Sequence, residues 1–149
     1  MVLYGEPIDT GCLTRAESPR VQVGDWSKGG RVISDLVKAV EVLDGLGIPG
    51  PYEAVLASAP YYAYLRAVGE AGYPATRQLK DIVSGVHRSS IVRDAGAVFS
   101  TRGGDFAITV GCDLSVGYRA DDRDGIHLVC LETVAAQTMT PKAVCVLGR

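Results

Sequence analysis

The 149-residue sequence has few aromatic residues, few charges and no long apolar run. Aromatic side chains make up 7% of the chain and charged ones 21%, slightly below the ~25% usual for a globular domain. Fifteen Lys and Arg against seventeen Asp and Glu leave a net charge of −2, so the chain lacks the basic surface that neutralises nucleic-acid phosphates. No apolar stretch approaches the ~18 residues of a membrane span. We therefore expect neither a nucleic acid nor a membrane as partner.

The sequence is equally poor in residues arranged for catalysis or metal binding. Its histidines, His87 and His127, have no nearby partner in the sequence that would make either one a base or a ligand. No glycine cluster matches a phosphate-binding motif. The cysteines are too widely spaced for a CxxC zinc or redox site, and a chain of this size needs no disulfides: they are Cys12, Cys112, Cys130 and Cys145. We expect no catalytic residue, no cofactor and no metal. Because the N-terminus lacks a secretory signal, we also expect a cytoplasmic protein with reduced thiols.

Apolar residues make up 47% of the chain, enough for one domain of this length to bury a core. Over residues 31–46 they recur at spacings of three and four, which predicts an amphipathic helix that stops at Gly45 and Gly47. The short apolar run over 52–57 predicts a buried strand, and Ser58 caps a second helix. The remaining segments predict a short helix over 75–84 and strands near 89–93, 97–101 and 143–147.

The clearest periodicity lies in residues 106–118. Apolar residues there alternate without interruption with small or polar ones: Phe106, Ile108, Val110, Cys112, Leu114, Val116 and Tyr118. Such alternation predicts one long strand with an apolar face. The charged loop over 120–125 is interpreted as a solvated hairpin connection, because its aspartates lack the ligand spacing of a calcium loop. A second long strand follows from Ile126 to about Thr138.

The predicted hairpin is long for so small a protein. Thirteen residues of antiparallel strand span roughly 44 Å, whereas a round globule of this chain length has a diameter of about 40 Å. The edges and faces of such a hairpin need cover, and neighbouring subunits are the obvious source. The sequence therefore predicts an oligomer.

From Gly50 onward the sequence resembles the encapsulins, the shell proteins of bacterial nanocompartments. The resemblance rests on the order and spacing of several short motifs, while residues 2–49 fit more loosely. The motifs are Gly50-Pro51-Tyr52, Arg102-Gly103-Gly104-Asp105-Phe106, Gly111 to Tyr118, Glu132-Thr133 with Gln137, and Pro141-Lys142-Ala143.

The resemblance implies an α+β fold of the tailed-phage major capsid type, of which this chain looks like the C-terminal part only. The N-terminal arm, the extended loop and the long spine helix of the family have no counterpart. We expect an axial domain from residues 31–104 and 141–149. A remnant of the peripheral domain, carrying the long hairpin, is expected from residues 1–30 and 105–140.

Site residues follow from the same resemblance. In encapsulin shells, loops of the axial domain line a pore, and by position the turn near 85–87 and one loop match it. The pore-loop candidates are Gly69, Glu70, Ala71, Gly72, Tyr73 and Pro74. The missing spine helix would leave the hairpin bare, which makes its apolar residues assembly-interface candidates: Phe106, Ile108, Val110, Leu114, Val116 and Tyr118. A cargo protein is not expected, because the cargo pocket of the family uses the absent N-terminal helix.

The sequence thus predicts a truncated encapsulin-like structural protein without catalytic activity. It would form a homo-oligomer, such as a small ring, rather than a standard closed shell, and it could also join full-length encapsulin. The alternative function is a regulatory module that caps full-length encapsulin subunits and limits their assembly. Proteolysis is disfavoured, because no Ser, Cys or Thr has a recognisable His and carboxylate partner.

Overall fold

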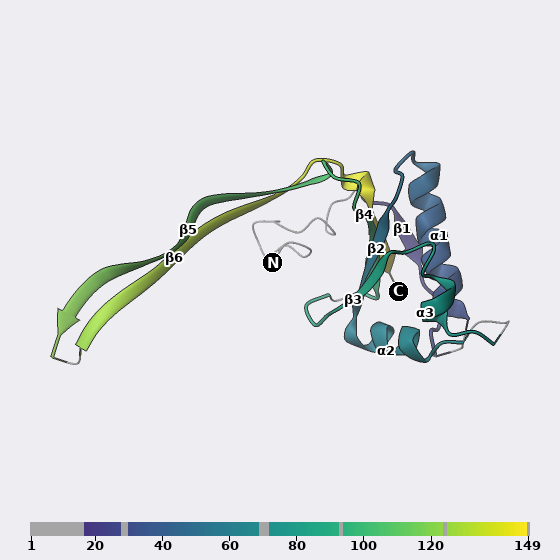
Figure 1. Ribbon diagram of the computed structural model, residues 1–149, viewed down its shortest axis with the longest axis horizontal. Coiled ribbons are helices and arrows are strands. Elements are labelled where there is room, and N and C mark those ends of the chain that lie inside the picture. Colours follow the sequence, from purple (N-terminus) through teal and green to yellow (C-terminus); the bar gives the residue numbers. More distant parts are fainter. Residues whose placement is uncertain (1–16, 28–29, 69–71, 93, 124, 149) are drawn as a thin grey trace.

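The computed structural model describes residues 17–27, 30–68, 72–92, 94–123 and 125–148. Two parts are visible in Figure 1: a body built on a five-stranded sheet, and a two-stranded hairpin that extends away from it. The strand order in the body is β1-β7-β4-β2-β3. The strands are β1 (Arg20–Gln22), β2 (Tyr52–Ala57), β3 (Gly85–Ser89), β4 (Gly96–Ser100) and β7 (Val144–Gly148).

The body sheet is mixed. The central strands β4 and β7 run antiparallel to each other, and β4 runs antiparallel to β2. The two edge strands are parallel to their neighbours, β1 to β7 and β3 to β2. Within the described residues, three α-helices accompany the sheet: α1 (Arg31–Gly45), α2 (Ser58–Arg66) and α3 (Ala75–Gln78). A short 3-10 helix, Pro141–Ala143, leads into β7.

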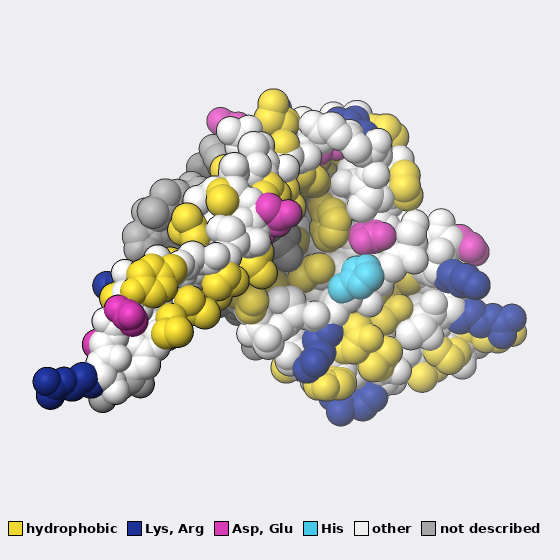
Figure 2. Space-filling view, turned by 60° about the vertical axis from the view of Figure 1, so that its left-hand side comes forward, with side chains coloured by type: hydrophobic (Ala, Val, Ile, Leu, Met, Phe, Trp, Pro, Cys, Tyr) yellow, Lys and Arg dark blue, Asp and Glu magenta, His cyan; other side chains and the backbone are white. Residues whose placement is uncertain are grey.

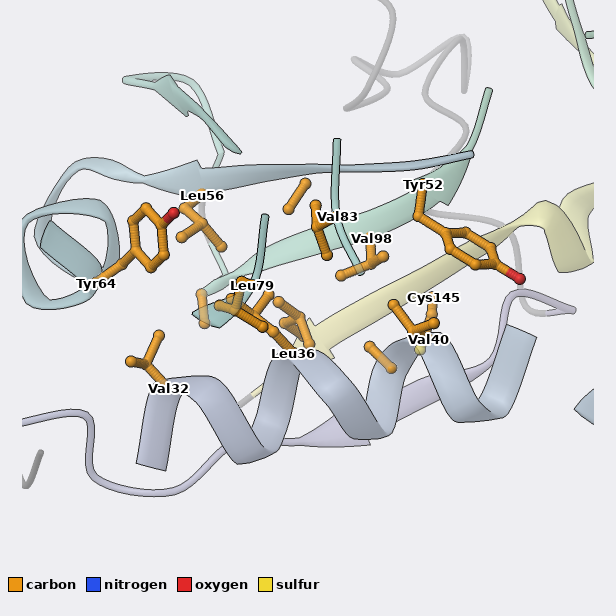
Figure 3. Packing of buried hydrophobic residues seen from close by; sticks show 14 of the residues in the cluster. Val32, Leu36, Val40, Tyr52, Leu56, Tyr64, Leu79, Val83, Val98 and Cys145 are labelled. Atoms are coloured by element: carbon orange, nitrogen blue, oxygen red, sulfur yellow. The ribbon is translucent and has the colours of Figure 1, made fainter. Parts of the chain in front are cut away.

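Helix α1 covers one face of the sheet and forms the main core with it. Its stripe of apolar residues is fully or nearly fully buried, and Figure 3 shows Leu36 and Val40 pointing toward Val98 and Cys145 of the sheet. The helix ends in a Schellman motif, in which the amide of Gly47 donates to the carbonyl of Asp44 and that of Ile48 donates to Leu43. Gly47 has a φ of 74°, a value that glycine adopts without strain.

Alternate residues of the central strands point to the opposite face of the sheet. There a smaller cluster forms around Ala97, Val144 and Val146, with Phe99 and Phe106 packed against it. Because β4 and β7 are buried on both faces, they anchor the body, and the hairpin leaves the body directly after β4 and returns directly before β7.

Most of the predicted elements are confirmed. The helix expected over 31–46, the strand over 52–57, the helix beginning at Ser58 and the last strand all form within one or two residues of their expected bounds. The helix expected over 75–84 is wrong beyond Gln78. There the chain turns to enter the sheet, and the amide of Ser84 donates to the carbonyl of Tyr52.

Two further expectations are corrected. The strand expected near 89–93 lies at Gly85–Ser89, so the predicted turn near 85–87 is an edge strand instead. The sequence places residues 1–30 with the hairpin, whereas their described part, 17–27, packs on the body. There β1 pairs with β7, and the side chains of Val23 and Trp26 are buried. The same segment is tied to α1 by the Asp35 carboxylate, which accepts from the amide of Gly24 at 2.9 Å and from the Trp26 indole at 2.8 Å.

Candidate functional site

The hairpin carries more than half of the exposed large apolar side chains that the structure describes. Its strands are β5 (Phe106–Asp122) and β6 (Gly125–Thr138), which pair only with each other among the described strands. Figure 1 shows them as a long, twisted ribbon that projects from the body, and Figure 2 shows apolar side chains gathered along it. The exposed fraction of its large apolar side chains reaches 72% at Ile126, although such residues are usually buried. This surface is therefore the first candidate for a contact with another molecule.

The pairing register assigns the hairpin residues to two faces, because residues directly opposite each other in an antiparallel pair share a face. The face that we call the apolar face includes Ile108, Val110, Val116, Tyr118, Ile126, Leu128, Cys130, Val134 and Ala136, and near the tip it also carries Asp121, which lies opposite Ile126. The other, which we call the mixed face, consists of Thr109, Cys112, Ser115, Gly117, His127, Val129, Leu131, Thr133 and Ala135. Glu132 also points to the apolar side of β6, since side chains alternate along a strand.

Three register shifts interrupt the pairing, and each adds a residue to β5. They lie between Val110 and Cys112, between Cys112 and Ser115, and between Tyr118 and Ala120. A single added residue turns the following side chains to the opposite face, and a second turns them back. The unbroken alternation expected over 106–118 is therefore wrong at Cys112, which lies opposite Thr133 on the mixed face.

The first two shifts together preserve the apolar face over most of the hairpin. After them, Val116 and Tyr118 return to the side already occupied by Ile108 and Val110. Gly111 occupies the first shift, where a Cβ atom would come within 2.9 Å of the Thr133 hydroxyl. A side chain at this position would press on the neighbouring strand.

Five of the six assembly-interface candidates are exposed. Ile108, Val110, Val116 and Tyr118 lie on the apolar face, Leu114 lies inside the second shift, and their exposed fractions range from 52% to 67%. Phe106 differs, because it is half-buried against the body. Its ring meets that of Phe99 edge-on at 6.4 Å, so it belongs to the root of the hairpin.

The root is held by an ion pair that the sequence analysis did not single out. The guanidinium of Arg102 donates two hydrogen bonds to the buried carboxylate of Asp105, both at 2.9 Å. These bonds lower the pKa of Asp105 despite its burial, and a hydrogen bond from Thr140 lowers it further. The Asp105 carbonyl also accepts from the amide of Met139 at 2.8 Å. Asp105 thus joins the outgoing and returning strands of the hairpin at the surface of the body.

The pore-loop candidates lie at the end of the body formed by α2 and α3. Gly69, Glu70 and Ala71 fall outside the described residues, whereas Gly72, Tyr73 and Pro74 are exposed. The guanidinium of Arg77 lies 5.4 Å from the centre of the Tyr73 ring, and the Gln78 amide donates to the Tyr73 carbonyl at 2.7 Å. These contacts attach Tyr73 to α3. The residue nevertheless remains more than half exposed.

The side chains that could take part in catalysis or metal binding lie far from one another. On the body, the Nε2 atom of His87 lies 3.2 Å from a carboxylate oxygen of Glu53; near the hairpin tip, that of His127 lies 2.9 Å from Asp122. Burial raises the pKa of the Cys145 thiol to about 11, which makes a reactive thiolate unfavourable. Over the described ranges, no three His, Cys, Asp or Glu side chains converge on a possible metal site. No helix in this part of the chain is long and apolar enough to cross a membrane.

Comparison with solved structures defines the class of protein. The crystal structure of a virus-like particle from Pyrococcus furiosus superposes with a TM-score of 0.78 at 17% identity, covering 91% of this chain and 58% of that one. A structure from Mycobacterium phage Che8 superposes with a TM-score of 0.62 at 12% identity, covering 87% of this chain and 53% of that one. The fold is therefore that of phage-capsid proteins, with mixed helices and strands as the sequence predicted.

Sequence comparison then identifies the family. The chain belongs to the encapsulin family, described as encapsulating protein for peroxidase, whose match spans residues 2–135. It is 33% identical over 108 residues to the type 1 encapsulin shell protein of Rhodospirillum rubrum, covering 72% of this chain and 39% of that protein. The corresponding protein of Mycolicibacterium paratuberculosis is 35% identical over 114 residues, covering 76% of this chain and 43% of that protein.

The similarity covers most of this chain but less than half of these relatives. A diheme-cytochrome-encapsulin shell fusion protein of Kuenenia stuttgartiensis matches 92% of this chain at 29% identity, yet only 38% of that protein is covered. The chain thus spans about two fifths of the length of the curated relatives that it matches.

Proposed function

We propose that this protein is a structural, self-associating member of the encapsulin family without catalytic activity. Copies of the chain associate through the apolar face of the hairpin into a homo-oligomer of limited size rather than a standard closed shell. The observation that carries the proposal is the set of large apolar side chains on that face, which stay more than half exposed in the single chain.

The size of the apolar face supports an interface. Two strands about 5 Å apart and roughly 45 Å long present a face of about 450 Å². The largest apolar patch of an ordinary monomer is of order 300–600 Å² and is often functional. At ~25 cal/mol per Å², covering such a face contributes on the order of 10 kcal/mol before the entropic cost of association. A second copy of the same face supplies this cover with matching length and polarity.

The limited assembly is proposed for the 149 residues of this sequence. The relatives named as shell proteins are more than twice as long as the aligned segment. We place the assembly in the cytoplasm, where the free thiols of Cys112 and Cys130 stay reduced.

The test compares two neighbouring residues of β5. Val110 lies on the apolar face and Thr109 on the mixed face, and both are exposed, so neither substitution disturbs the core of the body. We expect V110E to lower the mass of the oligomer at micromolar concentration, because each contact between apolar faces would bury a carboxylate without a partner. T109E should remain an oligomer. Size-exclusion chromatography with light scattering measures both masses.

A monomeric parent protein at micromolar concentration would refute the proposal. Equal loss of mass by both variants would show that the apolar face is not the interface. Circular dichroism of each variant serves as the control for folding.

A second function, capping of full-length encapsulin, is favoured by one observation. The chain aligns with two shell proteins over 72% and 76% of its own length, so it could occupy the place of the aligned segment in one subunit of a shell. Co-expression with a full-length shell protein tests this function: a capping module lowers the yield of shells, whereas an independent homo-oligomer leaves it unchanged.

A further inference from the structure

The two edges of the hairpin differ in regularity. All three register shifts add their extra residue to β5, and none adds one to β6. Bulges bend the strand that carries them and spoil its edge as a template for pairing. The 14 residues of β6 run from Gly125 to Thr138 without such an interruption, so β6 keeps a long, regular outer edge.

The side chains of β6 do not protect that edge either. Proteins commonly guard an exposed edge with Lys, Pro or several charges. Between Gly125 and Thr138 the sequence has no Pro, Lys or Arg, and Glu132 is its only carboxylate. By contrast, β5 carries Asp113, Arg119, Asp121 and Asp122 in addition to its bulges. Within the described residues, no strand other than β5 pairs with β6.

We propose that β6 of one copy pairs antiparallel with β6 of a second copy about a two-fold axis, with Leu131 of each copy opposite Leu131 of the other. The occupant of this edge is thus a second copy of the chain. The inference rests on the proposed function, self-association through the hairpin, and assigns to it a pairing edge and a register.

The register of the two β6 strands follows from the alternation of the apolar and mixed faces and from the charge of Glu132. A two-fold axis perpendicular to the sheet keeps the apolar faces of both copies on the same side, so a residue must meet one of the same face. Among such registers, those centred on Leu131 and on Glu132 pair the largest part of the 14-residue strand. Centring on Glu132 would place two carboxylates directly opposite each other, which is unfavourable. Centring on Leu131 instead places Glu132 opposite the neutral Cys130.

The area of the apolar face supports the pairing independently. Stacking two single hairpins face to face would cover roughly 900 Å² in total, which lies below the ~1,000 Å² expected of a stable biological interface. Pairing at β6 first doubles the width of the apolar face. Two such four-stranded sheets then cover roughly 1,800 Å², within the standard range. Edge pairing and face stacking together close at four chains with two-fold axes only.

Disulfide trapping tests the register. The background replaces Cys12, Cys112 and Cys130 by serine and keeps the buried Cys145. In it, L131C should form a covalent dimer at least ~10-fold faster than S115C under mild oxidation, because residues directly opposite each other across paired strands lie within disulfide distance. Ser115 is the matched control: it lies opposite Leu131 within the hairpin, on the same face, but on the other edge.

A second pair of variants tests the same register without Leu131. Centring on Leu131 places Val129 opposite Thr133 of the other copy. V129C and T133C should therefore form few dimers alone and a mixed disulfide when combined. The non-oxidised background protein is measured in parallel by light scattering.

Each result decides between the two proposals. An oligomer with preferential L131C and V129C–T133C trapping supports the edge and the register. An oligomer in which S115C dimerises as fast as L131C refutes the pairing and leaves association through the apolar face standing. Fastest trapping at position 132 or 130 refutes the register. A monomer refutes both proposals.

Discussion

Removal of the hairpin should leave a folded, monomeric body. The structure suggests a clean deletion of residues 107–137, because Phe106 and Thr138 lie directly opposite each other at the root and an Asn-Gly turn can join them. Phe106 remains in place against Phe99. Asp105 keeps its hydrogen-bond partners Arg102 and Thr140, and we call this group the Asp105 clamp. None of the buried core residues belongs to the deleted segment.

The expected free energy of unfolding can be worked out from this geometry. The deletion removes no buried apolar side chain, so the body loses almost no hydrophobic stabilisation. It also shortens the connection between β4 and β7 by about 30 residues, which lowers the entropic cost of closing that loop by about 1 kcal/mol. We therefore expect the deletion variant to match the stability of the parent chain at a concentration where that chain is monomeric, or to exceed it by up to ~1 kcal/mol.

Urea denaturation followed by fluorescence measures this quantity, since Trp26 is the single tryptophan of the chain and is buried in the body. Light scattering gives the mass. A deletion variant that is unfolded, or less stable than the monomeric parent chain by more than ~2 kcal/mol, would show that the hairpin stabilises its own body and would refute the reasoning. A deletion variant that still forms the parent oligomer would refute the role of the hairpin in association.

Two predictions concern the buried carboxylates. Asp35→Ala removes the acceptor of two hydrogen bonds, so we expect the free energy of unfolding in urea to fall by roughly 3–5 kcal/mol. The emission of Trp26 should shift to the red, because its indole loses its hydrogen-bond partner. Unchanged emission would contradict the role assigned to Asp35. The pKa of Asp105 is lowered in the folded protein, so the stability that it contributes is complete above its ordinary value, about 4, and is lost as the pH falls through the lower, folded value. The difference in stability between the parent and Asp105→Asn should therefore be constant from about pH 5 to 7 and shrink below about pH 4, and a difference that grows in acid would exclude this origin.

The sequence predicts the elements whose signal is local. The sequence patterns of α1 and β5 are periodic over more than ten residues, and the helix and the strand both form where expected. The edge strand β3 is different, because Gly85, His87 and Arg88 have little preference for strands. It forms because the parallel neighbour β2 supplies a ladder, which no local pattern reveals.

The register of the hairpin shows the same limit at the candidate site. Alternation alone places Cys112 with Val110 on the apolar face, whereas the pairing with β6 turns it to the other face. A bulge depends on how two strands far apart in sequence are matched, so its position cannot be read from one strand. Gly111 is the only sign of the first shift within β5 itself, since a Cβ atom at this position would come within 2.9 Å of the Thr133 hydroxyl. Arg102 and Asp105 are opposite charges three residues apart, so the sequence alone permits an ion pair between them. Only the structure shows that this pair lies at the root of the hairpin.

The Asp105 clamp lies at the base of a long hairpin, so a small rotation there produces a large displacement at the tip. A rotation of ~10° at the root would move the tip of an arm roughly 45 Å long by about 8 Å. Small changes in the hydrogen bonds around one carboxylate would thus move the whole apolar face, although none of the buried core residues belongs to the hairpin beyond its root. In an assembly of the kind proposed above, such a movement would let the hairpin contact a neighbouring copy at different angles.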